Sequence, residues 1–407
     1  MRKLAIASAL AMVASLLVAG PAGAAVDTAS RVDPYGATFE LDSDMSSLRS
    51  GLNLIDSELG SVNRSVDWVM NHANRTRTSL CHPAVYQQLV NQGALETGFC
   101  WGGGSSDDDG GTWKPQGITS TRDALSANYY DGHQLLGVSW YRTGQSRLSL
   151  VDWDAGYDNT YRHILFVEPT GTSVRYRDVP SHAGGMMWYG DLLYVADSDN
   201  RGFRIFDFRN IYSADTGSYC ADRTGRVHDG TSYLHCANGY AYIMPQVGWV
   251  RAPSGSPYLR VSTVSLDRST TPDSMVVAEF ASPDEGTQSD ATDSKNRLHP
   301  RFVRWSLDYT TRLPSSGYSS EAYGTNIQKV QGVASRDGTV YLASSNGANP
   351  GFLRSWNRST GVVRKTGWVI GAESLSFWGG DTNLLWTCTE RVNERVVVAA
   401  RPADLDL

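Results

Sequence analysis

The sequence predicts an all-β protein, a six-bladed β-propeller with five blades as the fallback, preceded by a small N-terminal helical segment. Three observations predict this class. Strand–turn–strand units recur along the chain, they recur about every 50 residues, and the composition suits short packed strands. The 407 residues include 40 Gly, 12 Trp and 20 Tyr. Such a composition is expected of many strands that are joined by turns and packed through aromatic rings.

The first 24 residues have the features of a secretory signal peptide. Arg2 and Lys3 precede an apolar stretch, and Ala22, Gly23 and Ala24 form a small-residue cleavage site. No later stretch approaches about 18 consecutive apolar residues, so no membrane partner is expected. The formal net charge of −6 argues against a nucleic-acid partner, which would need a basic face. The mature chain is therefore expected to be secreted and extracellular.

Residues 25–43 show no periodicity and are expected to be extended or disordered, and residues 44–111 are expected to form the helical segment. Apolar residues from Leu48 to Val69 alternate at spacings of four and three, which predicts an amphipathic helix over 46–70. Two interpretations of this helix remain open: it lies on its own domain, or it mediates self-association. A second helix is predicted within residues 82–98, where Pro83 suits a first helical turn.

Five cysteines in an exported chain predict disulfides. Cys81 with Cys100, and Cys220 with Cys236, each bracket a short segment, so local pairing is the simplest prediction. Cys388 remains unpaired within an apolar strand pattern. We predict a buried, unreactive thiol there.

From residue 112 the chain repeats an apolar strand, a polar turn and a second strand. The clearest units are residues 134–154, 192–210, 240–269, 340–359 and 384–404. The distance from Tyr242 to Tyr341, at matching places in two units, is about twice the period, so a hidden unit is expected between them. We therefore predict six blades within residues 112–407.

Residues 112–404 resemble the general pattern of secreted bacterial β-propellers, in particular exported actinobacterial ones with strands of the type LYVAD, found here at 193–197. The resemblance implies the architecture only, because propellers include lyases, hydrolases, lactonases and binding proteins.

The predicted innermost strands begin with polar residues. In a propeller these strands line a central channel, and its mouth is the deepest concavity available for a ligand. The predicted strands start near residues 115, 181, 228, 329 and 371, which places six polar residues at the mouth: Lys114, Gln116, His182, His228, Gln331 and Glu373. Glu373 is the only acid among them, and Asp131 and Glu390 are candidates from neighbouring loops.

The first hypothesis is an extracellular carbohydrate-active enzyme, most specifically a polysaccharide lyase. His182 would remove a proton beside a uronate carboxylate, Lys114 or Arg301 would stabilise the resulting charge, and Tyr129 or Tyr130 would serve as the acid. Gln116, His228, Gln331 and Glu373 would hydrogen-bond the ligand, and Trp113 and Trp188 would stack on sugar rings. Against this, polar residues at strand starts also cap turns or bind water, and tryptophans also pack sheets.

The second hypothesis is a non-catalytic secreted protein that binds glycan or protein partners, with the helix over 46–70 as an association surface. The chain has no HExxH, HxxxH or clustered CxxC motif, and so no recognisable zinc site. Asp107, Asp108 and Asp109 favour a solvated linker over a calcium loop. No cofactor is predicted, although the sequence leaves open a calcium ion held in the channel by several blades.

Overall fold

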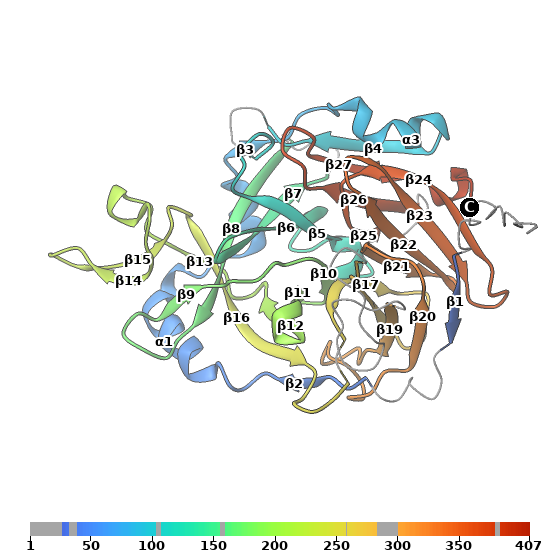
Figure 1. Cartoon of the computed structure of the whole chain (residues 1–407). Coiled ribbons are helices and arrows are strands. Elements are labelled where there is room, and N and C mark those ends of the chain that lie inside the picture. Colours follow the sequence, from blue (N-terminus) through green and yellow to red (C-terminus); the bar gives the residue numbers. More distant parts are fainter. Residues whose placement is uncertain are drawn as a thin grey trace, which may run out of the picture.

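The computed structural model describes residues 27–31, 39–102, 107–154, 159–257, 259–282, 300–378 and 383–407. The predicted signal peptide lies outside the described residues. The protein is an all-β propeller, and its described strands form five antiparallel four-stranded blades (Figure 1). The innermost strands contact one another in a closed ring, in the order β5, β10, β17, β21, β25 and back to β5.

The blades follow the chain in order. The first contains β5 (Lys114–Ser120), β6 (Leu135–Arg142), β7 (Gln145–Asp152) and β8 (Thr160–Pro169). The second contains β10 (Met186–Tyr189), β11 (Leu192–Asp197), β12 (Gly202–Asp207) and β16 (Tyr242–Arg251). The third contains β17 (Val261–Asp267), β18 (Ser274–Glu279), β19 (Arg301–Ser306) and β20 (Glu321–Thr325). The fourth contains β21 (Val330–Arg336), β22 (Thr339–Asn346), β23 (Asn349–Asn357) and β24 (Val363–Ile370).

The fifth blade joins the two ends of the chain. It contains β25 (Ala372–Trp378), β26 (Leu384–Thr389) and β27 (Val396–Ala400), and its outermost strand is β4 (Leu95–Cys100). β4 pairs antiparallel with β27. The blades therefore take a strand from within the predicted helical segment 44–111, upstream of the predicted boundary at residue 112.

The predicted count of six blades is not confirmed, because the described residues form five. The predicted inner strand at 228–234 is instead the tip of a hairpin, β14 (Thr224–His228) and β15 (Tyr233–Ala237), which projects from the body (Figure 1). The unit expected between Tyr242 and Tyr341 does exist and is the third blade. The sequence predicts one blade too many because the strands of this hairpin alternate apolar and polar residues and are joined by a turn, as the strands of a blade are.

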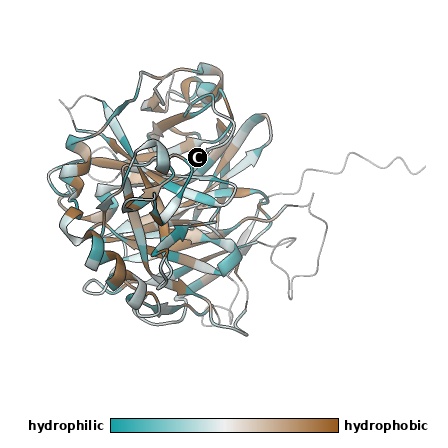
Figure 2. Ribbon diagram, turned by 90° about the vertical axis from the view of Figure 1, so that its left-hand side faces the viewer, coloured by the Kyte–Doolittle hydropathy of each residue, from teal (hydrophilic) through white to brown (hydrophobic). Residues whose placement is uncertain are grey.

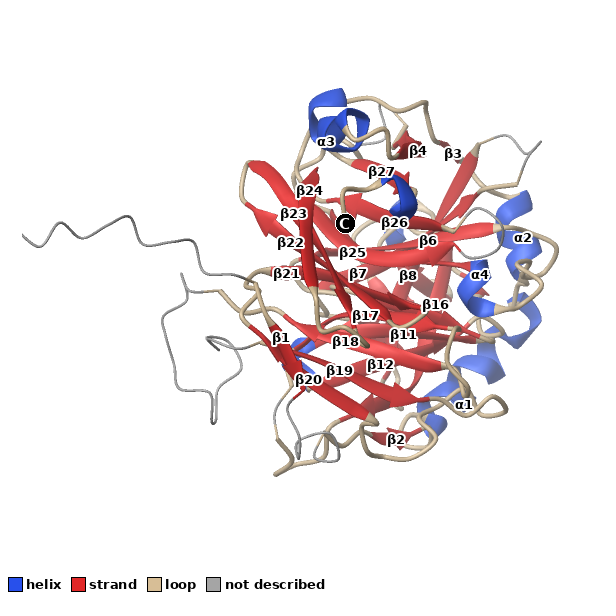
Figure 3. Cartoon of the chain, turned by 90° about the vertical axis from the view of Figure 1, so that its right-hand side faces the viewer, coloured by secondary structure: helices blue, strands red, loops and turns tan. Residues whose placement is uncertain are grey.

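The N-terminal helices are short and lie against the blades (Figure 3). The predicted helix over 46–70 is two helices, α1 (Arg49–Leu59) and α2 (Val66–Asn71), which are separated by η2 (Gly60–Val62) and residues 63–65. The predicted second helix is limited to η3 (Pro83–Tyr86) and α3 (Gln87–Asn91). The remaining short strands and α-helix are β1 (Ala29–Arg31), β2 (Asp42–Asp44), β3 (Arg75–Thr76), α4 (Thr121–Ala124), β9 (Tyr176–Asp178) and β13 (Tyr212–Ser213).

The chain's own blades cover the apolar seam of these helices. Ile55 and Leu59 are buried in one core cluster with residues of the first and fifth blades, and Val66 and Val69 are buried in another. A polar contact adds to this packing, since Arg175 Nε donates a hydrogen bond to Glu58 Oε1 at 2.9 Å. The seam therefore packs as expected for a helix laid on its own domain; self-association remains a prediction.

Aromatic residues fill the space between the blades. Hydrophobic residues, brown in Figure 2, run through the packed strands, and Trp140, Trp188 and Trp368 are fully buried. This packing accounts for most of the tryptophan content. Among the described residues, no helix is long and apolar enough to cross a membrane.

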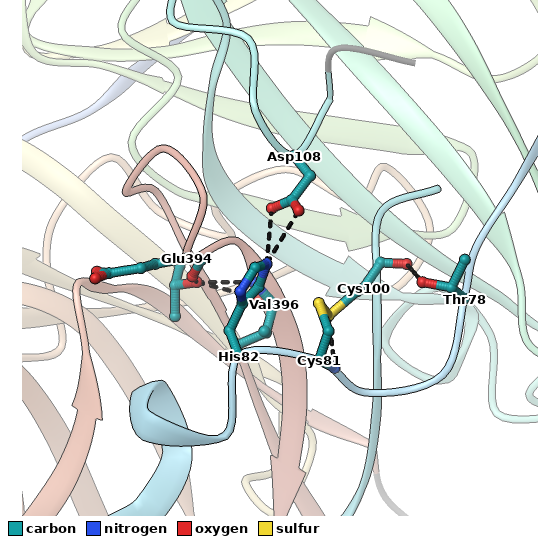
Figure 4. The surroundings of a disulfide bond; sticks show 8 residues. Thr78, Cys81, His82, Cys100, Asp108, Glu394 and Val396 are labelled. Carbon is teal, nitrogen blue, oxygen red and sulfur yellow. Dashed lines mark hydrogen bonds and ion pairs between the residues drawn. A yellow bond between two sulfur atoms is a disulfide. The ribbon is translucent and has the colours of Figure 1, made fainter. Parts of the chain in front are cut away.

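Both predicted disulfides, Cys81–Cys100 and Cys220–Cys236, are confirmed, and Cys388 is free and buried. The first disulfide fixes β4 to the segment that precedes η3. Figure 4 shows the imidazole of His82 turned toward Asp108, with 3.0 Å between Nε2 and Oδ2. Cys81, His82 and Cys100 are close enough together to hold a metal, but both sulfur atoms are already joined to each other.

The prediction of a solvated linker at residues 107–109 is wrong for Asp107. Asp107 is buried and accepts hydrogen bonds from Arg147 Nη2 (2.7 Å), Tyr161 Oη (2.7 Å) and Arg75 Nη1 (2.9 Å), and its carboxylate also contacts His163 Nε2 (3.1 Å). Burial alone would raise the pKa of Asp107. The hydrogen bond with His163, the positive charge that His163 gains only in strong acid, and the charges of the two arginines outweigh burial and hold this pKa well below its ordinary value.

Asp123 in α4 links the first and fifth blades at one end of the channel. Its Oδ2 accepts hydrogen bonds from Ser376 Oγ (2.9 Å) and Thr119 Oγ1 (3.3 Å). Burial raises the pKa of Asp123 to about 7, although these hydrogen bonds and the charges of Arg268 and Arg122 oppose the shift. An unfolded aspartate ionises near pH ~3.9, so the proton held by the folded state is lost at higher pH than in the unfolded chain.

We expect Asp123→Asn to stabilise the protein at alkaline pH. Between about pH 4 and about pH 7 the unfolded chain releases this proton while the folded chain retains it, so folding stability falls as pH rises and then levels off. Asparagine has no proton to lose. The gain in unfolding free energy should be on the order of 3 kcal/mol at about pH 8 and should vanish near pH ~4. Denaturant unfolding at both pH values measures it, and an equal effect at both would contradict the assignment.

Candidate functional site

A cavity of about 310 Å³ lies at the start of the inner strands, and we call it the front cavity. All five blades contribute to its lining, which consists of Lys114, Gln116, Tyr141, His182, Gly184, Asp197, Ser198, Asp199, Arg260, Ser262, Phe280, Gln331, Glu373 and Glu390. Five of the predicted site residues therefore lie together: Lys114, Gln116, His182, Gln331 and Glu373. They are distant in sequence and meet because each stands at the same end of a blade.

β-Bulges direct side chains into the front cavity. The pairing of an inner strand with its neighbour shifts register between Pro115 and Ile118, between Val261 and Thr263, between Val330 and Gly332, and between Glu373 and Ser376. A bulge adds a residue to one strand and re-aims its side chain. Gln116, Ser262 and Gln331 are residues of this kind, and all of them line the cavity.

Left-handed backbone conformations also occur beside the cavity residues. Ala183 follows His182 with φ of 53°, and Ser374 follows Glu373 with φ of 52°. Residues other than glycine seldom adopt positive φ, and such positions gather at functional sites where the surrounding structure holds them. The backbone is thus held in uncommon conformations next to the titratable residues His182 and Glu373.

Two glutamates in the front cavity are each held by a glutamine. Gln331 Nε2 donates to Glu373 Oε1 at 2.9 Å, and Gln116 Nε2 donates to Glu390 Oε2 at 3.0 Å. Glu373 is buried, with 3% of its surface exposed. Burial, and then the negative charge of Glu390, raise the pKa of Glu373 well above its ordinary value. Glu373 can therefore act as a proton donor.

His182 lies on the cavity wall and is open to its solvent. Its ring centroid is 4.0 Å from that of Tyr141, with 35° between the ring planes. Partial desolvation, followed by the charges of Lys114 and Arg260, lowers the pKa of His182 below its ordinary value. The imidazole is therefore neutral near physiological pH and can accept a proton.

Arg260, rather than the predicted Arg301, is the arginine of the front cavity. Arg260 precedes β17, whereas Arg301 lies on β19 with its guanidinium 5.1 Å from the centroid of the Phe39 ring. Another charged member, Asp197, is already paired, because Arg204 Nε donates to its Oδ2 at 2.6 Å. Lys114, Arg260, Asp199 and Glu390 are thus the charges most directly placed beside His182 and Glu373.

Three other predicted ligand residues lie elsewhere. His228 is exposed on the β14–β15 hairpin, where its ring meets that of Tyr233 at 4.8 Å. Trp188 is fully buried and stacks on Phe208 at 3.8 Å. Trp113 is 8% exposed, and the guanidinium of Arg147 lies 4.4 Å from its ring centroid. Both tryptophans pack the blades, and Tyr141 and Phe280 are the aromatic residues of the front cavity.

Sequence reasoning missed Arg260 and Tyr141 as site residues. Arg260 stands just before β17, which the repeat pattern makes the second strand of the unit at residues 240–269. Recognising β17 as an inner strand would have found Arg260. Tyr141 lies near the end of a second strand, β6, where no strand-start rule applies. Glu390 lies in the front cavity, as anticipated for a neighbouring loop, whereas Asp131 accepts a hydrogen bond from the backbone of Asp67 outside it.

Cys388 lies behind the cavity wall. Its Sγ is 3.3 Å from the carbonyl oxygen of Gln116, and burial, then the charges of Glu373 and Glu390, raise the pKa of the thiol. We expect this thiol to be unreactive toward an aromatic disulfide reagent in the native protein and to react with one equivalent after denaturation. Rapid labelling of the folded protein at Cys388 would contradict this placement.

A second, larger cavity of about 560 Å³ lies beside α1 and is lined by residues of the second and third blades. Three of its charged residues are already engaged: Arg209 Nη2 donates to Asp207 Oδ2 at 2.6 Å, and Asp191 accepts from Tyr130 Oη at 2.8 Å. The front cavity is therefore the better candidate for chemistry, despite its smaller volume.

Comparisons with known proteins do not assign the chain to a family. No protein-family model matches the chain, and no curated protein matches it. Among solved structures, it is similar to a GH43_1 enzyme from Xanthomonas citri, at 10% sequence identity and a TM-score of 0.33, covering 78% of this chain and 92% of that one. A likeness this distant does not bring that enzyme's activity to this chain.

Proposed function

We propose that the protein is an extracellular polysaccharide lyase that binds a uronate-containing polysaccharide in the front cavity. One observation carries the proposal: His182, Lys114, Arg260 and Glu373 line one cavity, in which the pKa of His182 is lowered and the pKa of Glu373 is raised. A base, charge neutralisation and an acid are the three groups that β-elimination requires.

The roles follow from the chemistry of each group. Lys114 and Arg260 bind the uronate carboxylate, and their charges stabilise the negative charge that develops when the adjacent carbon loses its proton. His182 accepts that proton. The carbon–oxygen bond to the next sugar then breaks as a carbon–carbon double bond forms, and Glu373 gives its proton to the departing oxygen. The products are a sugar with a free hydroxyl and an unsaturated uronate.

Substrate binding would also improve His182 as a base. The charges of Lys114 and Arg260 contribute to its lowered pKa in the free protein. A carboxylate bound between these cations offsets their charge, so the pKa of His182 rises toward its ordinary value when substrate is present. A general base is most effective when its pKa is near the operating pH.

Hydrolysis of a glycosidic bond is the second candidate, and the pair of glutamates favours it. Glu373 would protonate the leaving oxygen and Glu390, whose charge helps to raise the pKa of Glu373, would activate water or act as the nucleophile. In this alternative His182, Lys114 and Arg260 position the sugar.

The test is a screen of the mature chain against pectic, alginate, glycosaminoglycan and plant-gum polysaccharides. Two readouts are taken on each substrate: ultraviolet absorbance of unsaturated ends, and new reducing ends. Both signals rising together support the lyase. Reducing ends without the absorbance would replace it with the hydrolase, and saturable binding without either signal would leave a carbohydrate-binding protein.

A further inference from the structure

A third cavity, of about 220 Å³, lies at the opposite end of the inner strands, and we call it the rear cavity. β17 runs from next to Arg260 at the front to Asp267, which adjoins Arg268 at the rear; β5 runs likewise from Lys114 to Ser120, shortly before Arg122. The lining is Arg122, Asp123, Leu266, Arg268, Ser269, Ser335, Arg336, Asp337 and Phe377.

Three guanidinium groups meet at the rear cavity, and they are not equally engaged. Arg268 is committed to the protein, since Nε donates to Asp123 O at 2.9 Å, Nη2 to Ala124 O at 2.9 Å and Nη1 to Asp273 Oδ2 at 3.2 Å. Arg122 donates from Nη1 to Ser126 O at 2.6 Å. Arg336 is paired with the exposed Asp337, at 3.4 Å. Arg122 and Arg336 thus keep donors that a ligand can use.

The one buried acid of the rear cavity does not neutralise these arginines. Asp123 is 5% exposed, and its carboxyl is bonded to the hydroxyls of Ser376 and Thr119. Among the described residues it forms no ion pair with Arg122, Arg268 or Arg336. Protonated Asp123 can donate a hydrogen bond, and three nearby positive charges favour an acceptor that is negatively charged.

We propose that the rear cavity is a second binding site, for a small anion of the carboxylate or sulfate class. Arg122 and Arg336 hold the anion, the charge of Arg268 assists them, and protonated Asp123 donates a hydrogen bond to it. Phe377, which is 7% exposed, provides an apolar wall on which the ring of a sugar acid can rest. This site goes beyond the proposed function, which concerns the front cavity.

Anion binding at this site is coupled to a proton. The groups that face Asp123 are Thr119 from β5, Arg122 from its own helix, Ser376 from β25 and Arg268 after β17. Ionised Asp123 would repel the anion and has no hydrogen to donate. Burial raises the pKa of Asp123 to about 7. The fraction of the protein in which Asp123 is protonated, the form that binds the anion, therefore falls to about one tenth near pH ~8. Affinity should then be about tenfold weaker than at about pH 6.

The test is calorimetric titration of the mature chain with galacturonate, sodium sulfate and neutral galactose. Saturable binding of an anion, without binding of galactose, is expected. The anion that binds with the higher affinity, galacturonate or sulfate, shows whether the ligand is a sugar acid or an inorganic ion. Because the front cavity also carries cations, the titration is repeated with Lys114→Ala. Binding that survives in this variant, and is lost when Arg122→Ala and Arg336→Ala are added to it, belongs to the rear cavity, and this outcome is independent of whether the protein is a lyase.

Two variants decide the assignment. The double variant Arg122→Ala, Arg336→Ala should weaken anion binding at least about tenfold, whereas Arg223→Ala, on the exposed hairpin, should not change it. Asp123→Asn keeps a hydrogen-bond donor and should bind with little dependence on pH. The proposal is overturned if neither anion binds saturably in Lys114→Ala, if the folded double variant binds as the parent does, or if Asp123→Asn retains the tenfold fall.

Discussion

His182→Ala is expected to lower the rate of polysaccharide cleavage by about a hundred- to ten-thousand-fold, the range found when a positioned proton-transfer group is removed. The imidazole is the base of the front cavity, because His182 is the histidine of its lining and an amide nitrogen, as in Gln116 or Gln331, is not basic. Thermal stability should change little, because the side chain is open to the cavity and packs at a tilt against the ring of Tyr141. Initial rates of absorbance change measure the effect.

The matched control is His228→Ala, which removes an exposed imidazole from the hairpin and should leave the rate unchanged. A second readout separates a base from a merely structural histidine. Activity should fall in acid as His182 gains a proton and in alkali as Glu373 loses one. Lys114→Ala should move the acidic limb of the pH–rate profile to higher pH, because it removes a charge that lowers the pKa of His182. Full activity of folded His182→Ala would refute the lyase mechanism.

Asp107→Ala is expected to destabilise the fold by about 3–5 kcal/mol, as when one partner of a buried ionic network is removed. The loss leaves Arg147 and His163, both buried, without their shared carboxylate. His163 is already kept neutral, because burial and the charge of Arg147 lower its pKa to about 3. Arg147 therefore bears most of the penalty. The unfolding free energy from urea denaturation measures it.

The control for this change is Asp109→Ala, two residues away and exposed, which should alter stability by less than about 0.5 kcal/mol. The effect also depends on pH. The depressed pKa of Asp107 contributes stability above the value of ~3.9 at which the unfolded aspartate ionises, and this contribution is lost as pH falls toward the folded value. The difference between parent and variant should therefore shrink in strong acid. Similar stability of both variants near neutral pH would show that Asp107 does not hold this network.

The front cavity was predictable where the repeat itself places a residue. Lys114, His182 and Glu373 stand at equivalent starts of inner strands, and equivalent positions in a ring converge on one mouth. His228 followed the same rule and is misplaced, because a disulfide-bonded hairpin has the alternation and turn residues of a blade. Alternation reports that a strand exists, but not which sheet it joins.

Tyr141 could not be predicted from period or composition. It lies near the end of β6, and its place in the front cavity depends on how neighbouring strands pack. Trp188 and Trp113 fit a sugar-binding surface by residue type alone, yet their environments are apolar packing and stacked guanidinium groups. Burial in a tertiary structure, which a single sequence does not display, decides between these roles.

The pairing of β4 with β27 has a consequence for how the molecule is made. The strand that completes the fifth blade is synthesised before any blade exists, and its partner β27 is translated only after the other four blades. The ring thus stays open, with a hydrogen-bonding edge exposed at each end, until β27 has emerged. A chain truncated before Val396 should remain unclosed and prone to edge-to-edge aggregation, however well its first four blades are formed.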